Sequence, residues 1–329
     1  MNWLIWLGFF AIFIGVLALD LGVLHREAKA MQVRQALGWT VVWIVVALSF
    51  AGLVYGVYEY QWFGWHAIGE DPPDGAEAAI QFVTGYLLEW SLSVDNIFVI
   101  AIIFTYMKIP AQFQYRVLFW GIIGAIVLRG AMIAMGAALI HAFDWTFYLF
   151  GAILLYSAWR MLRSEDDQFD PGKSVLVRLA RRVYPVTDKL DGERFFTLVD
   201  GARAATPLFV TLLLVDFADV VFAVDSIPAI FAVTQEPFIV FTSNAFAILG
   251  LRSLYFAIAG LMMMFKYIKF SLIFILGFVG VKMLLHHHLE IPHAISLGVI
   301  VGFLAIGIIA SLWVSRREAA SGTPDLRND

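Results

Sequence analysis

Two short acidic phrases of matching design occur in this chain. They read Glu89-Trp-Ser-Leu-Ser-Val-Asp95-Asn96-Ile97 and Asp219-Val-Val-Phe-Ala-Val-Asp225-Ser226-Ile227. Each places a carboxylate, an aspartate six residues later, a small polar residue and an isoleucine in the same order. Both lie in long apolar stretches, where an ionised carboxylate is costly unless it faces a partner, water or a cation. The matched positions predict an ion site to which both phrases contribute.

The chemistry of these side chains favours a hard divalent cation. Carboxylate, amide and hydroxyl oxygens suit Mg²⁺, Ca²⁺ or Mn²⁺ better than Cu⁺ or Zn²⁺. The four carboxylates carry −4 when ionised, and the arginines nearest the membrane centre, Arg129 and Arg252, carry +2. The remainder of −2 matches one divalent cation or two protons, which is the basis of an exchange; Asp216, one turn before Asp219, would add one negative charge. Alternatively, the acids only pair with the two arginines and hold helices together.

Helical geometry limits how the two acids of one phrase can share an ion. Each residue of an ideal helix turns by about 100°, so side chains six residues apart point about 120° apart. They converge only if the helix is broken between them. Pro228 is expected to supply a break in the second phrase, because it removes an internal hydrogen bond. Ser91, Ser93 and Asn96 are weaker helix-looseners in the first phrase.

The composition is that of an integral membrane protein. Of the 329 residues, 61% are hydrophobic and 15% are charged, with a mean hydropathy of +0.82. Soluble domains are about half apolar and a quarter charged. The sequence contains no cysteine, which excludes disulfides and thiolate metal sites.

We expect an all-α membrane fold, because about 20 apolar residues form a helix that crosses the hydrocarbon core. Nine stretches qualify: 2–24, 36–58, 78–106, 113–140, 142–162, 205–233, 237–262, 267–285 and 292–314. Lys and Arg occur in every second loop and are absent from the alternate loops, which predicts an outer N-terminus and a cytoplasmic C-terminus. The 163–204 loop and the 316–329 tail are then cytoplasmic. We expect an amphipathic helix and a linker in the loop, which is either a solvated connection or a protein-binding segment.

The matching extends beyond the acidic phrases. In the helix that follows each phrase, Arg129 of the first unit matches Arg252 of the second. One helix later, Arg160-Met161-Leu162 matches Lys282-Met283-Leu284. An odd number of crossings in each three-helix unit inverts the second unit relative to the first, as in many secondary transporters with midplane sites. Within a single transmembrane domain, 1–315, the repeats are 78–162 and 205–285, and the peripheral helices are 2–24, 36–58 and 292–314.

Three longer strings are similar to signatures of the TerC family. They are Glu89-x-x-Leu92-Ser93-x-Asp95-Asn96, the string from Asp216 to Thr234, and the string from Pro237 through Asn244 to Arg252. Length and helix order resemble the Alx-like branch over about residues 10–314. The resemblance implies a multi-pass protein of the bacterial inner membrane that exports manganese. By position, the implied metal-binding residues are Glu89, Asp95, Asn96, Asp219, Asp225 and Ser226, with Asp216 and Asn244 as neighbours.

Two functions of different class follow from these observations. The leading hypothesis is a secondary transporter that exports a divalent cation, with Mn²⁺ favoured and Ca²⁺ or Mg²⁺ left open, in exchange for protons. The alternative is a membrane scaffold that assists a translocase or an envelope stress response, in which the acidic residues have only a structural role. We expect no enzyme, resident cofactor or nucleic-acid partner. The cluster of His286–His288, Glu290 and His293 is either a metal-capture patch or a set of interfacial anchors.

Overall fold

The computed structural model describes residues 3–22, 33–64, 73–163, 185–187, 189–199, 201–259, 268–285 and 291–321. These residues form nine α-helices, a short 3-10 turn and one β-hairpin. The helices are α1 (Trp3–Gly22), α2 (Val33–Glu59), α3 (Gly75–Tyr106), α4 (Ala111–Ala142), α5 (Thr146–Arg163), α7 (Pro207–Phe231), α8 (Pro237–Ala259), α9 (Ile268–Leu284) and α10 (His293–Ser321), with η1 (Trp62–Gly64) after α2.

Each apolar stretch in the sequence coincides with one of these helices. Within the described residues, six helices are long and apolar enough to cross a bilayer: α2, α3, α4, α7, α8 and α10. Helix α1 contributes a shorter apolar run, Trp3–Ala18, and α9 has 17 residues. The prediction of a predominantly helical, multi-pass membrane protein is confirmed, and the count of nine crossings stays a prediction.

The helices that carry the acidic phrases begin at well-defined signals. The Asp74 side chain caps α3 by accepting a hydrogen bond from the backbone N–H of Glu77 at 2.7 Å, which satisfies a free donor of the first turn. Helix α7 begins with Pro207, whose missing N–H costs nothing at the first helical position. Local sequence therefore fixes where each phrase-bearing helix starts.

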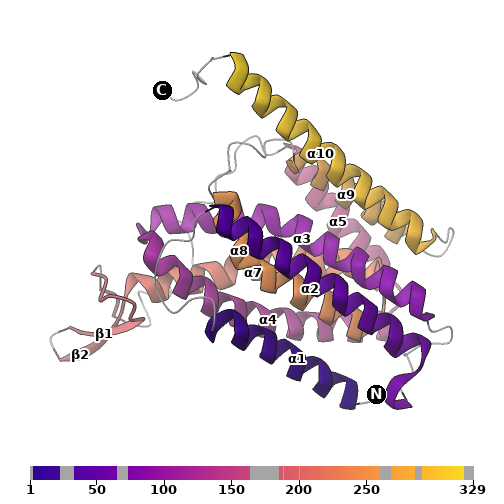
Figure 1. Ribbon diagram of the computed structural model, residues 1–329, viewed down its shortest axis with the longest axis horizontal. Helices are drawn as coiled ribbons and strands as arrows, with labels where there is room; N and C mark the ends of the chain where they lie inside the picture. Colours follow the sequence, from indigo (N-terminus) through magenta and orange to yellow (C-terminus); the bar gives the residue numbers. More distant parts are fainter. Residues whose placement is uncertain are drawn as a thin grey trace.

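Three helix pairs form the centre of the bundle. Helix α3 packs on α8 and α4 packs on α7, while α5 packs on α9. Helix α8 is the central element, because 89% of its most apolar segment is buried, against 22% of the corresponding segment of α10. In Figure 1, α1 and α10 lie along opposite edges of the bundle. Helix α2 joins α8 through aromatic rings such as Phe50 and Phe246, whose centroids are 4.5 Å apart.

The segment before α7 contains a β-hairpin where the sequence reading expected only a helix and a linker. Strand β1 (Phe196–Val199) pairs antiparallel with β2 (Ala202–Ala205), and Val199 opposes Ala202. The loop between them reads Asp-Gly, and Gly201 has a φ of +83°, which glycine adopts without steric cost. Asp-Gly between β-forming residues is a strong hairpin signal. The linker prediction was wrong here, and residues 164–184, where the amphipathic helix was expected, lie outside the described part.

Helices α5 and α9 cross at a pair of glycines. A Cβ on Gly280 would lie 3.0 Å from Leu155 Cγ and 3.2 Å from the carbonyl oxygen of Gly151. A Cβ on Gly151 would lie 2.9 Å from Leu284 Cδ2 and 3.1 Å from the carbonyl oxygen of Gly280. The contact is therefore reciprocal: Gly280 packs against Gly151 and Leu155, and Gly151 packs against Gly280 and Leu284. Small residues at membrane-helix crossings let backbones approach closely.

We predict that Gly280→Leu lowers the thermal unfolding midpoint of the purified protein, because overpacking of this kind costs about 1–3 kcal/mol. Gly277→Leu is the matched control on the same helix, since a Cβ there would meet nothing within 4 Å. Thermal unfolding in one detergent measures both variants. Equal midpoints for the two would show that the glycine crossing does not limit the packing of α5 on α9.

Candidate functional site

The centre of the bundle holds a buried arginine. Arg129 of α4 is 1% exposed and is the bulkiest fully buried side chain among the described residues. Its Nη2 and Nε donate to Asp219 Oδ1 and Oδ2 at 2.7 and 2.8 Å, and its Nη1 donates to Glu89 Oε1. Glu89 and Asp219 are the first carboxylates of the two acidic phrases. The structure therefore joins the phrases through one guanidinium.

Two further polar side chains complete this group. Asn244 Nδ2 of α8 donates to Glu89 Oε2 at 2.9 Å. Arg129 Nη1 also donates to Ser226 Oγ of α7 at 3.3 Å. A charge taken out of water must be both paired and hydrogen-bonded to be tolerated. Four helices, α3, α4, α7 and α8, meet that requirement together, and we refer to these five side chains as the central cluster.

The helix break expected at Pro228 is absent. Helix α3 is continuous from Gly75 to Tyr106, and α7 continues through Pro228 to Phe231. Proline is tolerated inside membrane helices because neighbouring groups satisfy the freed backbone. At Pro228 the helix ends within one further turn, with the N–H of Ala232 bonded back to the carbonyl of Pro228. Pro228 therefore lies near the end of α7 and does not divide the phrase.

Because the helices are continuous, the second aspartate of each phrase points elsewhere. Ser157 Oγ of α5 donates to Asp225 Oδ1 at 2.5 Å, and Arg160 interacts electrostatically with Asp225. Asp95 instead interacts electrostatically with Lys269 of α9. This is the divergence of about 120° that an ideal helix imposes on residues six apart. The predicted convergence of all four carboxylates is not found, and the described part of the chain holds no group of three or more His, Asp or Glu side chains arranged to hold a metal ion.

Asp216 brings a third carboxylate beside the central cluster. It lies one turn before Asp219 on α7 and interacts with it electrostatically. Its carboxylate packs against Gly124 of α4, where a Cβ would lie 2.8 Å from Oδ1. That oxygen is buried and has no hydrogen-bond partner among the described residues. A buried unsatisfied oxygen calls for an explanation such as a water or an ion.

The remaining predicted residues lie around this centre. Asn96 is buried on α3. The guanidinium of Arg252 lies 4.8 Å above the ring of Tyr115. Arg252 and Asp219 also line a cavity of about 20 Å³ between α3, α4, α7 and α8, which is room for about one water molecule. Arg252 therefore approaches the central cluster from α8 across a small cavity.

The predicted histidine cluster is described only at its end. His286–His288 and Glu290 lie outside the described residues. His293, at the start of α10, has its Nε2 3.2 Å from Glu77 Oε1 and 3.3 Å from Gln81 Nε2. These contacts tie α10 to the first turns of α3.

Comparison with known proteins identifies the family. The profile described as integral membrane protein TerC family matches residues 74–319. The chain belongs to the TerC family. An uncharacterised membrane protein of Myxococcus xanthus is 47% identical over 96% of this chain and 94% of its own length. A protein of Escherichia coli K12, provisionally named membrane-bound redox modulator Alx, is 45% identical over 96% of each chain. No solved structure matched the chain.

Every residue of the central cluster falls inside the matched TerC region, and so do Gly124 and Ser157. The sequence reading named all five members of the cluster. It missed the two neighbours, Gly124 beside Asp216 and Ser157 beside Asp225, because a glycine and a serine in an apolar helix give no sequence signal of such a contact.

We predict that Arg129→Met destabilises the protein by about 3–5 kcal/mol, because it leaves two buried carboxylates without their cation. The triple variant Arg129→Met, Glu89→Gln, Asp219→Asn removes those charges as well and should recover most of the loss. Thermal unfolding and abundance in the membrane measure both. If the single and triple variants are equally unstable, the ion pairs do not hold the centre of the bundle.

Proposed function

We propose that this TerC protein is a secondary transporter that exports a divalent cation, with Mn²⁺ favoured, across the bacterial inner membrane in exchange for protons. The observation that carries the proposal is the central cluster, with the unsatisfied oxygen of Asp216 beside it. Ionisable residues inside a membrane bundle usually mark an ion or substrate pathway.

The charge of this centre favours a cation. Glu89 and Asp219 pair with Arg129, and Asp216 lies one turn from Asp219, so these four side chains carry a formal charge of −2 when all three acids are ionised. Arg252, which lines the small cavity together with Asp219, reduces that charge to −1. The donors are hard oxygens, which suit Mn²⁺, Mg²⁺ or Ca²⁺. Mn²⁺ is favoured among these because of the exporter function that the TerC resemblance implies.

In this proposal, Arg129 occupies the carboxylates when the transported ion is absent. A guanidinium keeps its proton at any physiological pH, so it can neutralise Glu89 and Asp219 without a proton supply. An arriving cation competes with Arg129 for the same oxygens, and Asp216 offers an oxygen that no donor among the described residues holds. Protons that bind the acids after the cation leaves would restore neutrality, which couples the two flows.

The transported ion would meet the acids at three levels. The second aspartates, Asp95 and Asp225, lie six residues beyond Glu89 and Asp219, about 9 Å further along each helix axis. Because α3 and α7 run in opposite directions in inverted repeats, Asp95 and Asp225 lie on opposite sides of the central cluster. Each has its own neighbouring cation, Lys269 for Asp95 and Arg160 for Asp225. We assign the central cluster to ion binding and the second aspartates to the ion path.

The packing supports two inverted repeats, α3–α5 and α7–α9. Helix α3 packs on α8 as α4 packs on α7, which exchanges the roles of equivalent helices. The crossing of α5 on α9 is reciprocal at Gly151 and Gly280. Nine crossings would place the N-terminus outside, and the 163–204 loop and 316–329 tail in the cytoplasm, in agreement with the Lys and Arg distribution.

We predict that Asp219→Asn reduces Mn²⁺ flux in proteoliposomes at least about tenfold, the lower end of the loss typical when even an outer partner of a metal ligand is removed. Flux is measured with an imposed pH gradient and with equal amounts of reconstituted protein. Asp144→Asn is the matched control, since Asp144 is an exposed aspartate between α4 and α5; it should keep wild-type flux.

Two outcomes would contradict the transporter proposal. Wild-type Mn²⁺ flux in Asp219→Asn would leave the acids structural, as the scaffold alternative requires. Mn²⁺ flux that does not change with the imposed pH gradient would rule out exchange for protons. A thiol-based redox role, to which the name of the E. coli relative could point, has no support here, because the sequence contains no cysteine.

A further inference from the structure

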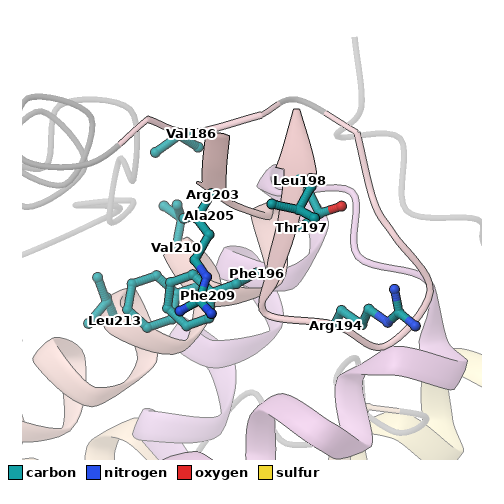
Figure 2. Close-up of a pocket in the computed structure, with 10 residues that line it drawn as sticks. All are labelled: Val186, Arg194, Phe196, Thr197, Leu198, Arg203, Ala205, Phe209, Val210 and Leu213. Atoms are coloured by element: carbon teal, nitrogen blue, oxygen red, sulfur yellow. The ribbon is translucent and has the colours of Figure 1, made fainter. Parts of the chain in front are cut away.

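A groove of about 860 Å³ lies between the β-hairpin and the start of α7. Figure 2 shows that its lining comes from the stretch before the hairpin, from both strands and from the first turns of α7. The apolar part includes Phe196, Phe209 and Leu213, and the rings of Phe196 and Phe209 are 4.6 Å apart. The groove is therefore apolar along the side formed by the spanning helix.

The groove lies where a membrane-spanning helix begins. Helix α7 is one of the six candidate spans, and its apolar sequence starts at Pro207. Phe209, Val210 and Leu213 of its first two turns line the groove. The hairpin that forms the other side directly precedes this helix. The groove therefore lies at the level of the lipid headgroups and upper acyl chains.

The hairpin exposes apolar side chains around the groove. Leu198 is 70% exposed, Phe196 45% and Val199 41%. Three large apolar residues exposed on one four-residue strand are unfavourable in water. The same residues are stabilised when an interfacial element is buried at the headgroup–acyl boundary.

Two arginines give the groove its charge. Arg194 and Arg203 line it, and its described lining contains no acidic residue. The Arg194 side chain is 76% exposed, and its ion pair with Asp191 is long, at 3.6 Å. Guanidinium groups match the geometry of phosphate through paired hydrogen bonds. Basic pockets beside membrane helices are typical sites for anionic lipid headgroups.

We propose that this groove binds an anionic phospholipid of the bilayer. The positive charge of Arg194 and Arg203 attracts the headgroup phosphate, and the upper part of an acyl chain follows Phe196, Phe209 and Leu213. The volume is within the range of about 300–1,000 Å³ for small-ligand sites, which accommodates the headgroup and upper chain. The inference does not depend on cation transport, since it concerns only the hairpin and the start of α7.

Native mass spectrometry of the purified full chain tests this proposal, with phosphatidylglycerol and phosphatidylcholine of identical acyl chains as probes. Wild-type protein should retain phosphatidylglycerol in preference to phosphatidylcholine. The double variant Arg194→Gln, Arg203→Gln should lose at least about tenfold in affinity for phosphatidylglycerol. The charge-matched control is Arg163→Gln, Lys189→Gln, since neither residue lines the groove; it should retain wild-type binding.

Three results would overturn the proposal. Equal retention of the two lipids would show that the arginines do not select a charged headgroup. Unchanged phosphatidylglycerol binding in the Arg194→Gln, Arg203→Gln variant would place the lipid elsewhere. Displacement of bound phosphatidylglycerol by inorganic phosphate at the same concentration would show that the groove recognises phosphate without the lipid. Equal thermal midpoints for the variants and wild type ensure that lost binding is not lost folding.

Discussion

A guanidinium that cannot lose its proton is buried at the centre of the helix bundle, and the arrangement of the central helices depends on neutralising it. Arg129 binds Glu89 on α3 and Asp219 on α7, while Asn244 on α8 binds the free oxygen of Glu89. Moving α3, α4 or α7 outward would leave a charge unpaired in a low-dielectric interior, which costs several kilocalories. Moving α8 outward would leave a buried oxygen of Glu89 without its hydrogen bond. The same constraint leaves the centre negative once Asp216 is counted, so that a further cation is favoured there.

Continuous helices determine how the four phrase acids are distributed. Since α3 and α7 are unbroken through their phrases, Glu89 and Asp219 point to α4, whereas Asp225 points to Ser157 on α5. The carboxylates are therefore spread along the bundle, with Asp95 and Asp225 apart from Glu89 and Asp219, and form no single cage. In the proposed transport, the ion exchanges one set of oxygens for the next, and each set has its own positive neighbour that opposes permanent binding of the ion.

Much of the fold was predictable, because length and hydropathy alone decide where a membrane helix runs. Depth and charge indicated that the acids could pair with Arg129 and Arg252, but did not single out the pairing of Glu89 and Asp219 with Arg129. Rotations between helices were not predictable, since a contact such as Asp216 against Gly124 depends on packing that no local pattern encodes.

The helix break predicted at Pro228 was wrong, because the effect of a proline depends on its distance from the end of the helix. The sequence alignment of the two repeats matched Arg160 with Lys282. This alignment is shifted by seven residues, about two helical turns, from the one indicated by the contact between Gly151 and Gly280. The hairpin carried a readable Asp-Gly signal and was overlooked within a polar loop.

The competition between Arg129 and a divalent cation is tested most directly by anomalous diffraction at the manganese edge, from crystals of the wild-type protein grown with Mn²⁺. We predict an anomalous peak that contacts Glu89 or Asp219, with the guanidinium of Arg129 displaced from at least one of them. A peak remote from both carboxylates, with both Arg129 ion pairs intact, would contradict the assignment of this centre to ion binding.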